Sequence, residues 1–233
     1  AAREKLTQLK DAGLHGILIS VNPFILEYVP FERTLRAIRI AREVFGGNTM
    51  IYQEFFRRQI ERLGVHGTMP LNDYLDRTGI SGLYYAEILP MGRACYELGH
   101  LFMRYPAESF FNESCRDDLT RPWHIHVDNY CNYITGYCGG ISLGDARDLD
   151  AICSGIDLDD YPILARLVSE RGIEQLYTFS VEEFGYRESR SGYISKCHLC
   201  VDIRRHIIGQ TDEFKELRPK EFYRNLTGET RPS

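Results

Sequence analysis

The sequence predicts an α/β fold in two parts: a partial α/β barrel over residues 1–105, and a small α+β domain with a β-hairpin over residues 106–233. Three observations support this prediction. In the first part, amphipathic helical segments alternate with short apolar runs, which is typical of βαβ units on a parallel sheet. Past Pro106 that rhythm stops, and two alternating runs flank a turn. Six of the seven cysteines lie in the second part.

The first part begins with a helix, a strand and a second helix. Residues 3–12 read as the end of an amphipathic helix that stops at Gly13. Residues 16–21 form a short apolar run behind that helix, which indicates a buried parallel strand. Residues 31–45 place Ile38 and Ala41 on one helical face, and two glycines end the segment.

The same rhythm continues to the end of the first part. The elements expected here are a strand over 49–52, a helix over 54–63 with Phe55 and Phe56 buried, a short helix over 71–77, a third strand over 82–89 and a helix over 93–104. Three parallel strands cannot close a barrel. Since the chain also opens on a helix, we expect the N-terminal part of the barrel to lie outside it.

The second part is predicted to contain one hairpin and several helices. Residues 124–127 and 132–134 alternate in polarity, and Asp128-Asn129 supplies the turn between them. Helices are expected over 161–171, 173–184, 197–208 and 219–226.

Composition excludes several classes of partner. A formal net charge of −5 gives no electrostatic basis for binding nucleic acid. No apolar run reaches the roughly 18 residues of a membrane span, so no membrane partner is expected. Seven cysteines without a secretory signal indicate a reducing compartment, and hence a cytoplasmic protein whose thiols are available as ligands. The chain carries no serine-hydrolase, P-loop, zincin or Rossmann motif.

The cysteines are the main functional signal. Cys197 and Cys200 form a C-x2-C pair at the start of a predicted helix, a spacing that fits a metal ligand pair, a redox pair or two core cysteines. Cys115 precedes the predicted hairpin and Cys138 follows it, and a hairpin brings its two ends together. Four such thiols suit an iron–sulfur cluster or zinc. The alternative is four buried free thiols, since cysteine is often a core residue.

These motifs resemble the C-terminal two-thirds of a radical S-adenosylmethionine (radical SAM) protein that carries a SPASM- or twitch-type auxiliary cluster domain. The resemblance spans nearly the whole chain. It rests on Leu89-Pro90-Met91-Gly92-Arg93-Ala94 after the third predicted strand, on a cysteine at each end of the hairpin, and on the late C-x2-C pair.

The resemblance implies a set of site residues. Cys115, Cys138, Cys197 and Cys200 would bind one auxiliary [4Fe–4S] cluster. Ser20, at the end of its strand, would meet the methionine moiety of S-adenosyl-L-methionine, and the backbone near Leu89 would lie near the adenine. In the intact protein, a 5′-deoxyadenosyl radical would abstract hydrogen from a peptide or small-molecule substrate. The auxiliary cluster would accept an electron or bind the substrate, and an electron-donor protein is the further partner.

The chain departs from the family pattern twice. The C-x3-C-x2-C motif that holds the SAM-binding cluster does not occur in it, so we do not expect this chain alone to cleave SAM. Cys131 stands in the hairpin turn, where the family usually has glycine, and it is either a spare ligand or a tolerated small residue.

The alternative function is a non-catalytic interaction domain with a zinc site made of four cysteines or of cysteines and histidines. His124 and His126 fall on one face of a strand, which would suit such a site, although a solvent-facing position is the simpler expectation. Cys95 and Cys153 are expected in the core. Arg204-Arg205 is expected on a solvated helix face.

Overall fold

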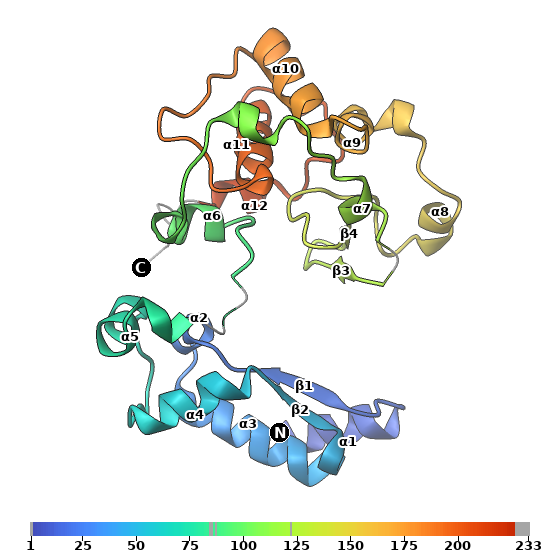
Figure 1. Cartoon of the computed structure of the whole chain (residues 1–233). Helices are drawn as coiled ribbons and strands as arrows, with labels where there is room; N and C mark the ends of the chain where they lie inside the picture. The colour runs from blue at the N-terminus through green and yellow to red at the C-terminus, as the bar shows by residue number, and fades with distance from the viewer. Residues whose placement is uncertain (1, 84–85, 87, 122, 227–233) are drawn as a thin grey trace. The chain divides into compact units, whose positions relative to one another are not determined.

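The computed structural model describes residues 2–83, 86, 88–121 and 123–226 (Figure 1). The chain divides into two compact units, residues 1–87 and 88–233. Both units combine helices with short strands, so the mixed α/β composition is as predicted. Within the described part of the chain, no helix has both the length and the apolar character needed to cross a membrane.

The division between the units comes before the boundary that the sequence predicted at residue 105. Residues 88–105 belong to the second unit because hydrogen bonds tie them to it. The Ser195 hydroxyl donates to the Pro90 carbonyl at 2.7 Å. Tyr105 and Tyr193 form an antiparallel bridge, with N–H···O distances of 2.8 Å in both directions.

The first unit is built on two parallel strands, β1 (Ile17–Ser20) and β2 (Thr49–Tyr52), with Ile17 opposite Thr49 and Ser20 opposite Tyr52. Helix α3 (Phe31–Phe45) connects them and packs against both strands, and α1 (Ala2–Asp11) packs on α3. The predicted bounds of α3 and β2 are confirmed. Gly46, with φ of +58°, ends α3 because glycine adopts the left-handed region without a steric penalty.

The remaining elements of this unit are α2 (Pro23–Leu26), η1 (Gly46–Asn48), α4 (Glu54–Arg62), α5 (Leu71–Thr78) and η2 (Ile80–Leu83). Helix α4 buries Phe56 fully, as predicted, but Phe55 is 41% exposed. Adjacent helical residues point about 100° apart, so the two rings cannot share the buried face.

The third strand predicted over residues 82–89 is wrong for the residues that the structure describes. Gly82 lies in η2, where its N–H donates to the Gly79 carbonyl and its carbonyl accepts from the Tyr74 hydroxyl. Ala86 N–H turns back to the Leu83 carbonyl at 2.8 Å. These bonds hold the backbone in turns. Residues 84, 85 and 87 of this segment lie outside the described residues.

The second unit begins with short elements, and its two longest helices come in its C-terminal half. Its elements are α6 (Ala94–Glu97), η3 (Gly99–Leu101), η4 (Ala107–Phe110), α7 (Arg116–Leu119), β3 (Ile125–Val127), β4 (Tyr133–Thr135), α8 (Leu149–Cys153), η5 (Leu158–Asp160), α9 (Pro162–Leu167), α10 (Gly172–Phe184), α11 (Lys196–Ile208) and α12 (Lys220–Arg224). Strands β3 and β4 pair antiparallel, with Ile125 opposite Thr135. The helix predicted over 93–104 is wrong in extent: it breaks into α6 and η3 at Gly99, since glycine weakens a helix interior.

The core of the second unit lies between α9, α10 and α11. Leu176 of α10 and Leu199, Ile203 and Ile207 of α11 are fully buried there. Each such side chain contributes about 1.5–3 kcal/mol relative to an exposed position. This packing fixes α11, whose first turns carry the C-x2-C pair.

Candidate metal centre

The N-terminus of α11 presents two cysteines on one face. Ser195 caps the helix by accepting from the His198 N–H at 3.1 Å, and it also anchors Pro90. Cys197 and Cys200 are three residues apart in the first turns, a spacing that places side chains next to each other. The positive end of the helix dipole stabilises thiolates at such positions.

Cys115 is held against this helix end by neighbouring contacts. Its N–H donates to the carbonyl of Leu167, the last residue of α9, at 2.9 Å. Lys196 of α11 donates to the Ser114 carbonyl at 2.9 Å and pairs with Asp118 of α7 at 3.0 Å. The segment that carries Cys115 is therefore fixed at both sides.

Cys138 follows β4 in a tight loop. The Thr135 hydroxyl donates to the Leu119 carbonyl at 2.8 Å, which ties the end of β4 to α7. Gly136 has φ of +54°, and a Cβ there would lie 2.9 Å from the Asp118 carbonyl oxygen. Only glycine permits this close approach, which brings the Cys138 loop beside α7.

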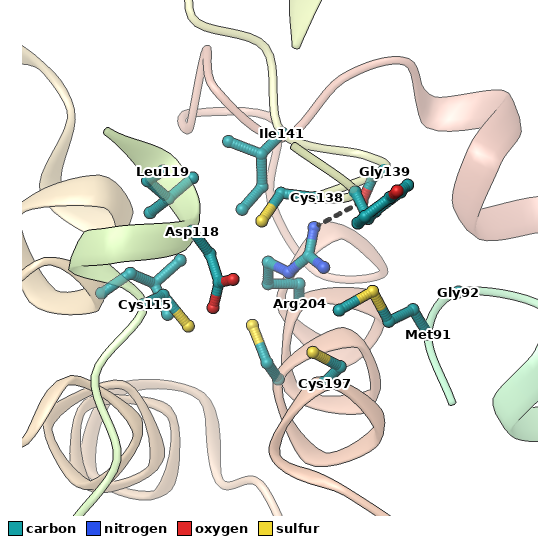
Figure 2. A pocket seen from close by; sticks show the side chains of 13 residues that line it. Met91, Gly92, Cys115, Asp118, Leu119, Cys138, Gly139, Ile141, Cys197 and Arg204 are labelled. Atoms are coloured by element: carbon teal, nitrogen blue, oxygen red, sulfur yellow. Dashed lines mark hydrogen bonds between the residues drawn. The ribbon is translucent and has the colours of Figure 1, made fainter. Parts of the chain in front are cut away.

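These three segments bring the four cysteines predicted as ligands to one pocket. Cys115, Cys138, Cys197 and Cys200 all line it, together with Asp118 and Arg204. Figure 2 shows the sulfur atoms of the labelled cysteines around a common space, with the Arg204 guanidinium beside it. The cavity has a volume of about 30 Å³, so a bound group must be small, or the thiol side chains must turn outward to admit it.

In the absence of a metal, burial raises the pKa values of Cys115, Cys138 and Cys197 and so favours their protonated forms. Burial raises the pKa of Cys138 to about 11. Burial, together with the nearby Cys200 sulfur, raises the pKa values of Cys115 and Cys197. A coordinating metal reverses this effect, because a bound thiol loses its proton outright. These three thiols are therefore weak nucleophiles until a metal-containing centre binds, and sulfur ligands are chemically suited to such a centre.

Arg204 is a member of the site that sequence reasoning missed. It was expected in solvent, and that prediction is wrong, since the residue is 4% exposed. Its Nη1 donates to the Gly139 carbonyl at 3.1 Å and to the Tyr223 hydroxyl at 2.8 Å. The spacing in the sequence could have placed Arg204 at the site. Arg204 follows Cys200 by four residues and Cys197 by seven, so all three lie on one face of the helix.

The remaining cysteines do not line the pocket. Cys95 is buried, as predicted, and its thiol donates to the Pro90 carbonyl at 3.0 Å. Cys153 is exposed at the end of α8, so its predicted core position is wrong. Cys131 lies in the turn between β3 and β4 with φ of +65°. Glycine would be free of strain in that conformation.

The other residues predicted for the site lie elsewhere. Ser20 ends β1 in the first unit, and Leu89 is a 43% exposed residue of the second unit. The rings of His124 and His126 are 4.6 Å apart beside β3 and do not line the cysteine pocket.

Among the described residues, no three or more His, Cys, Asp or Glu side chains are arranged to hold a single metal ion.

Comparisons of the chain with known protein families, with curated proteins and with solved structures give no match. The function must therefore be argued from the site itself.

Proposed function

We propose that the second unit is the auxiliary cluster domain of a radical SAM protein, and that Cys115, Cys138, Cys197 and Cys200 bind its [4Fe–4S] cluster. One observation supports this most strongly: four cysteines from three separate segments line one pocket, whereas Cys95, Cys131 and Cys153 do not. Cysteines that serve only as core residues need not converge on one cavity.

The surroundings of the pocket suit a negatively charged centre. The start of α11 supplies the positive end of a helix, and Arg204 and Lys196 supply cationic side chains. When bound, the cluster supplies one-electron transfer or a binding position for the substrate. The substrate is a peptide or a small molecule, and an electron-donor protein is the further partner.

The first unit takes its proposed role from the same resemblance. Its parallel pair, β1 and β2, would be part of the SAM-binding barrel, with Ser20 at the end of a strand where ligands of parallel sheets bind. The radical chemistry itself needs the C-x3-C-x2-C motif, which this chain does not contain.

The second candidate is a structural zinc site made by the same four thiols. The small cavity of about 30 Å³ favours it, because a single ion needs less room than a cluster. The two candidates differ in the element bound, so analysis of metal content decides between them.

The test is a cysteine-to-serine series in the full chain, prepared and reconstituted without oxygen. Iron, acid-labile sulfide and zinc are measured per chain for the wild type and for Cys115→Ser, Cys138→Ser, Cys197→Ser and Cys200→Ser. Each variant should lose most of the iron and the visible charge-transfer absorption. Cys95→Ser and Cys153→Ser are the matched controls and should keep both, because their sulfurs do not line the pocket. Stoichiometric zinc without iron in the wild type would contradict the cluster assignment.

A further inference from the structure

Arg204 is a deeply buried cation whose hydrogen bonding is incomplete. Its Nη1 donates to the Gly139 carbonyl and to the Tyr223 hydroxyl. Its Nε is also buried, and it has no hydrogen-bond partner among the described residues. A buried polar group without a partner is costly, and a buried charge more so. The Nε–H of Arg204 therefore needs a hydrogen-bond acceptor, and a group bound in the pocket that Arg204 lines would supply one.

The described protein groups do not neutralise this charge. The two acceptors of Arg204 are a carbonyl and a phenol, and burial raises the pKa of Tyr223 to about 12, so the phenol is neutral at physiological pH. Asp118 lines the same pocket, but it pairs with Lys196 at 3.0 Å and with Arg121 at 3.1 Å. No described carboxylate forms an ion pair with Arg204. The positive charge of Arg204 is therefore not balanced by a carboxylate among the described residues.

The thiols of the pocket supply negative charge once they bind a metal centre, because a bound thiol loses its proton. The guanidinium of Arg204 is charged at physiological pH. It lines the pocket together with Cys138 and Cys200. Since Arg204 lies one helical turn beyond Cys200, α11 itself sets this juxtaposition.

We propose that Arg204 compensates the negative charge of the centre bound by the four cysteines and sets its reduction potential. This inference rests on the proposed function. The unpaired Nε–H is available to a sulfur of the bound group, and hydrogen bonds to sulfur together with net charge are what tune such potentials. On reduction, one electron enters the cluster from an external donor and no proton moves, because Arg204 is charged in both states.

The sign of the effect follows from the charges. The reduced centre carries one more negative charge than the oxidised centre, so a neighbouring guanidinium favours the reduced state. Removing the charge should lower the ratio of reduced to oxidised cluster about tenfold at a fixed solution potential. This loss equals a decrease of ~59 mV in the reduction potential of a one-electron couple.

The experiment compares Arg204→Gln, Arg204→Lys and Arg205→Gln in the full chain after anaerobic reconstitution. Each protein is titrated with dithionite in the presence of redox dyes, and the reduced cluster is followed by electron paramagnetic resonance. Arg204→Gln should show the tenfold loss, and Arg204→Lys, which keeps the charge, should stay within about threefold of the wild type. Arg205→Gln is the matched control, since Arg205 is the next residue on the helix and does not line the pocket.

Every outcome bears on the proposal. If Arg204→Gln holds a cluster with the wild-type potential, or with a higher one, the inference is overturned and the cluster assignment stands. If the wild type binds zinc and no iron, both are overturned. If Arg204→Gln fails to hold iron while Arg204→Lys holds it, the charge-compensating role is supported. If both variants lose iron together with helical circular dichroism, Arg204 is a folding residue only, and the inference is overturned.

Discussion

Replacing Gly140 by alanine tests how the loop after β4 positions Cys138. Gly140 has φ of +77°, and a Cβ there would lie 2.4 Å from a ring carbon of Phe222 and 2.8 Å from Cζ of Tyr223. Phe222 is half-buried and can turn aside. Tyr223 is 3% exposed and is held by hydrogen bonds with the Gly140 carbonyl and with Arg204, so it cannot.

The expected cost has two parts. A left-handed backbone costs a residue with a Cβ about 1–2 kcal/mol. Overpacking against a fixed side chain costs about 1–3 kcal/mol more. Gly140→Ala should therefore lower the free energy of unfolding by about 2–5 kcal/mol.

Gly155→Ala is the matched control. Gly155 also has a positive φ, +98°, but no heavy atom lies within 4 Å of its built Cβ. This variant should carry the backbone cost alone, about 1–2 kcal/mol. Urea unfolding of the metal-free chain, followed by circular dichroism at one pH, gives both values. Equal losses in the two variants would refute the claim that Gly140 is needed for packing against α12.

Two further predictions address the units separately. In the first unit, a hydrogen bond from Arg57 is the main cause that lowers the pKa of Glu54 to about 2. The stability that Glu54 supplies is thus present above its ordinary pKa of 4.5 and lost as the pH falls from there toward 2, so Glu54→Gln should be destabilised near neutral pH and match the wild type in acid. A pH-independent difference in urea unfolding would contradict this. In the second unit, the Asp202 carboxylate accepts from the hydroxyls of Tyr186 at 2.7 Å and Tyr96 at 3.2 Å. Asp202→Asn leaves one hydroxyl without an acceptor and should cost about 1–3 kcal/mol in the same assay, whereas unchanged stability would show that the network is not stabilising.

The long periodic elements were the predictable part of the fold. Helix α3 and strand β2 have the bounds that the sequence predicted, and α10 and α11 each begin one residue earlier than predicted. Their patterns are decided by residues close together in the chain. The failure at residues 82–89 has a tertiary cause: an apolar, aromatic run reads as a strand, but the Tyr74 hydroxyl and a local turn engage the backbone of Gly82.

The site was predictable where spacing carried the information. Cys197 and Cys200 share a helix face by sequence spacing alone. Cys115 and Cys138 line the same pocket because the Thr135 hydroxyl and the close approach of Gly136 hold the segment after β4 against α7. Spacing also places Arg204 on the face of Cys197 and Cys200, but it does not predict that the side chain is buried, because an Arg-Arg pair in a helix usually faces solvent. Its burial depends on Gly139 and Tyr223, which the fold brings from two distant segments.

The most direct test of the central claim is X-ray absorption at the iron and zinc K edges of the full chain, reconstituted without oxygen. We expect bound iron with a sulfur shell and a short iron–iron vector, because the four thiols are proposed to hold a cluster. Both signals should disappear in the paired Cys197→Ser and Cys200→Ser variant. A zinc edge with four sulfur ligands and no bound iron would contradict this expectation.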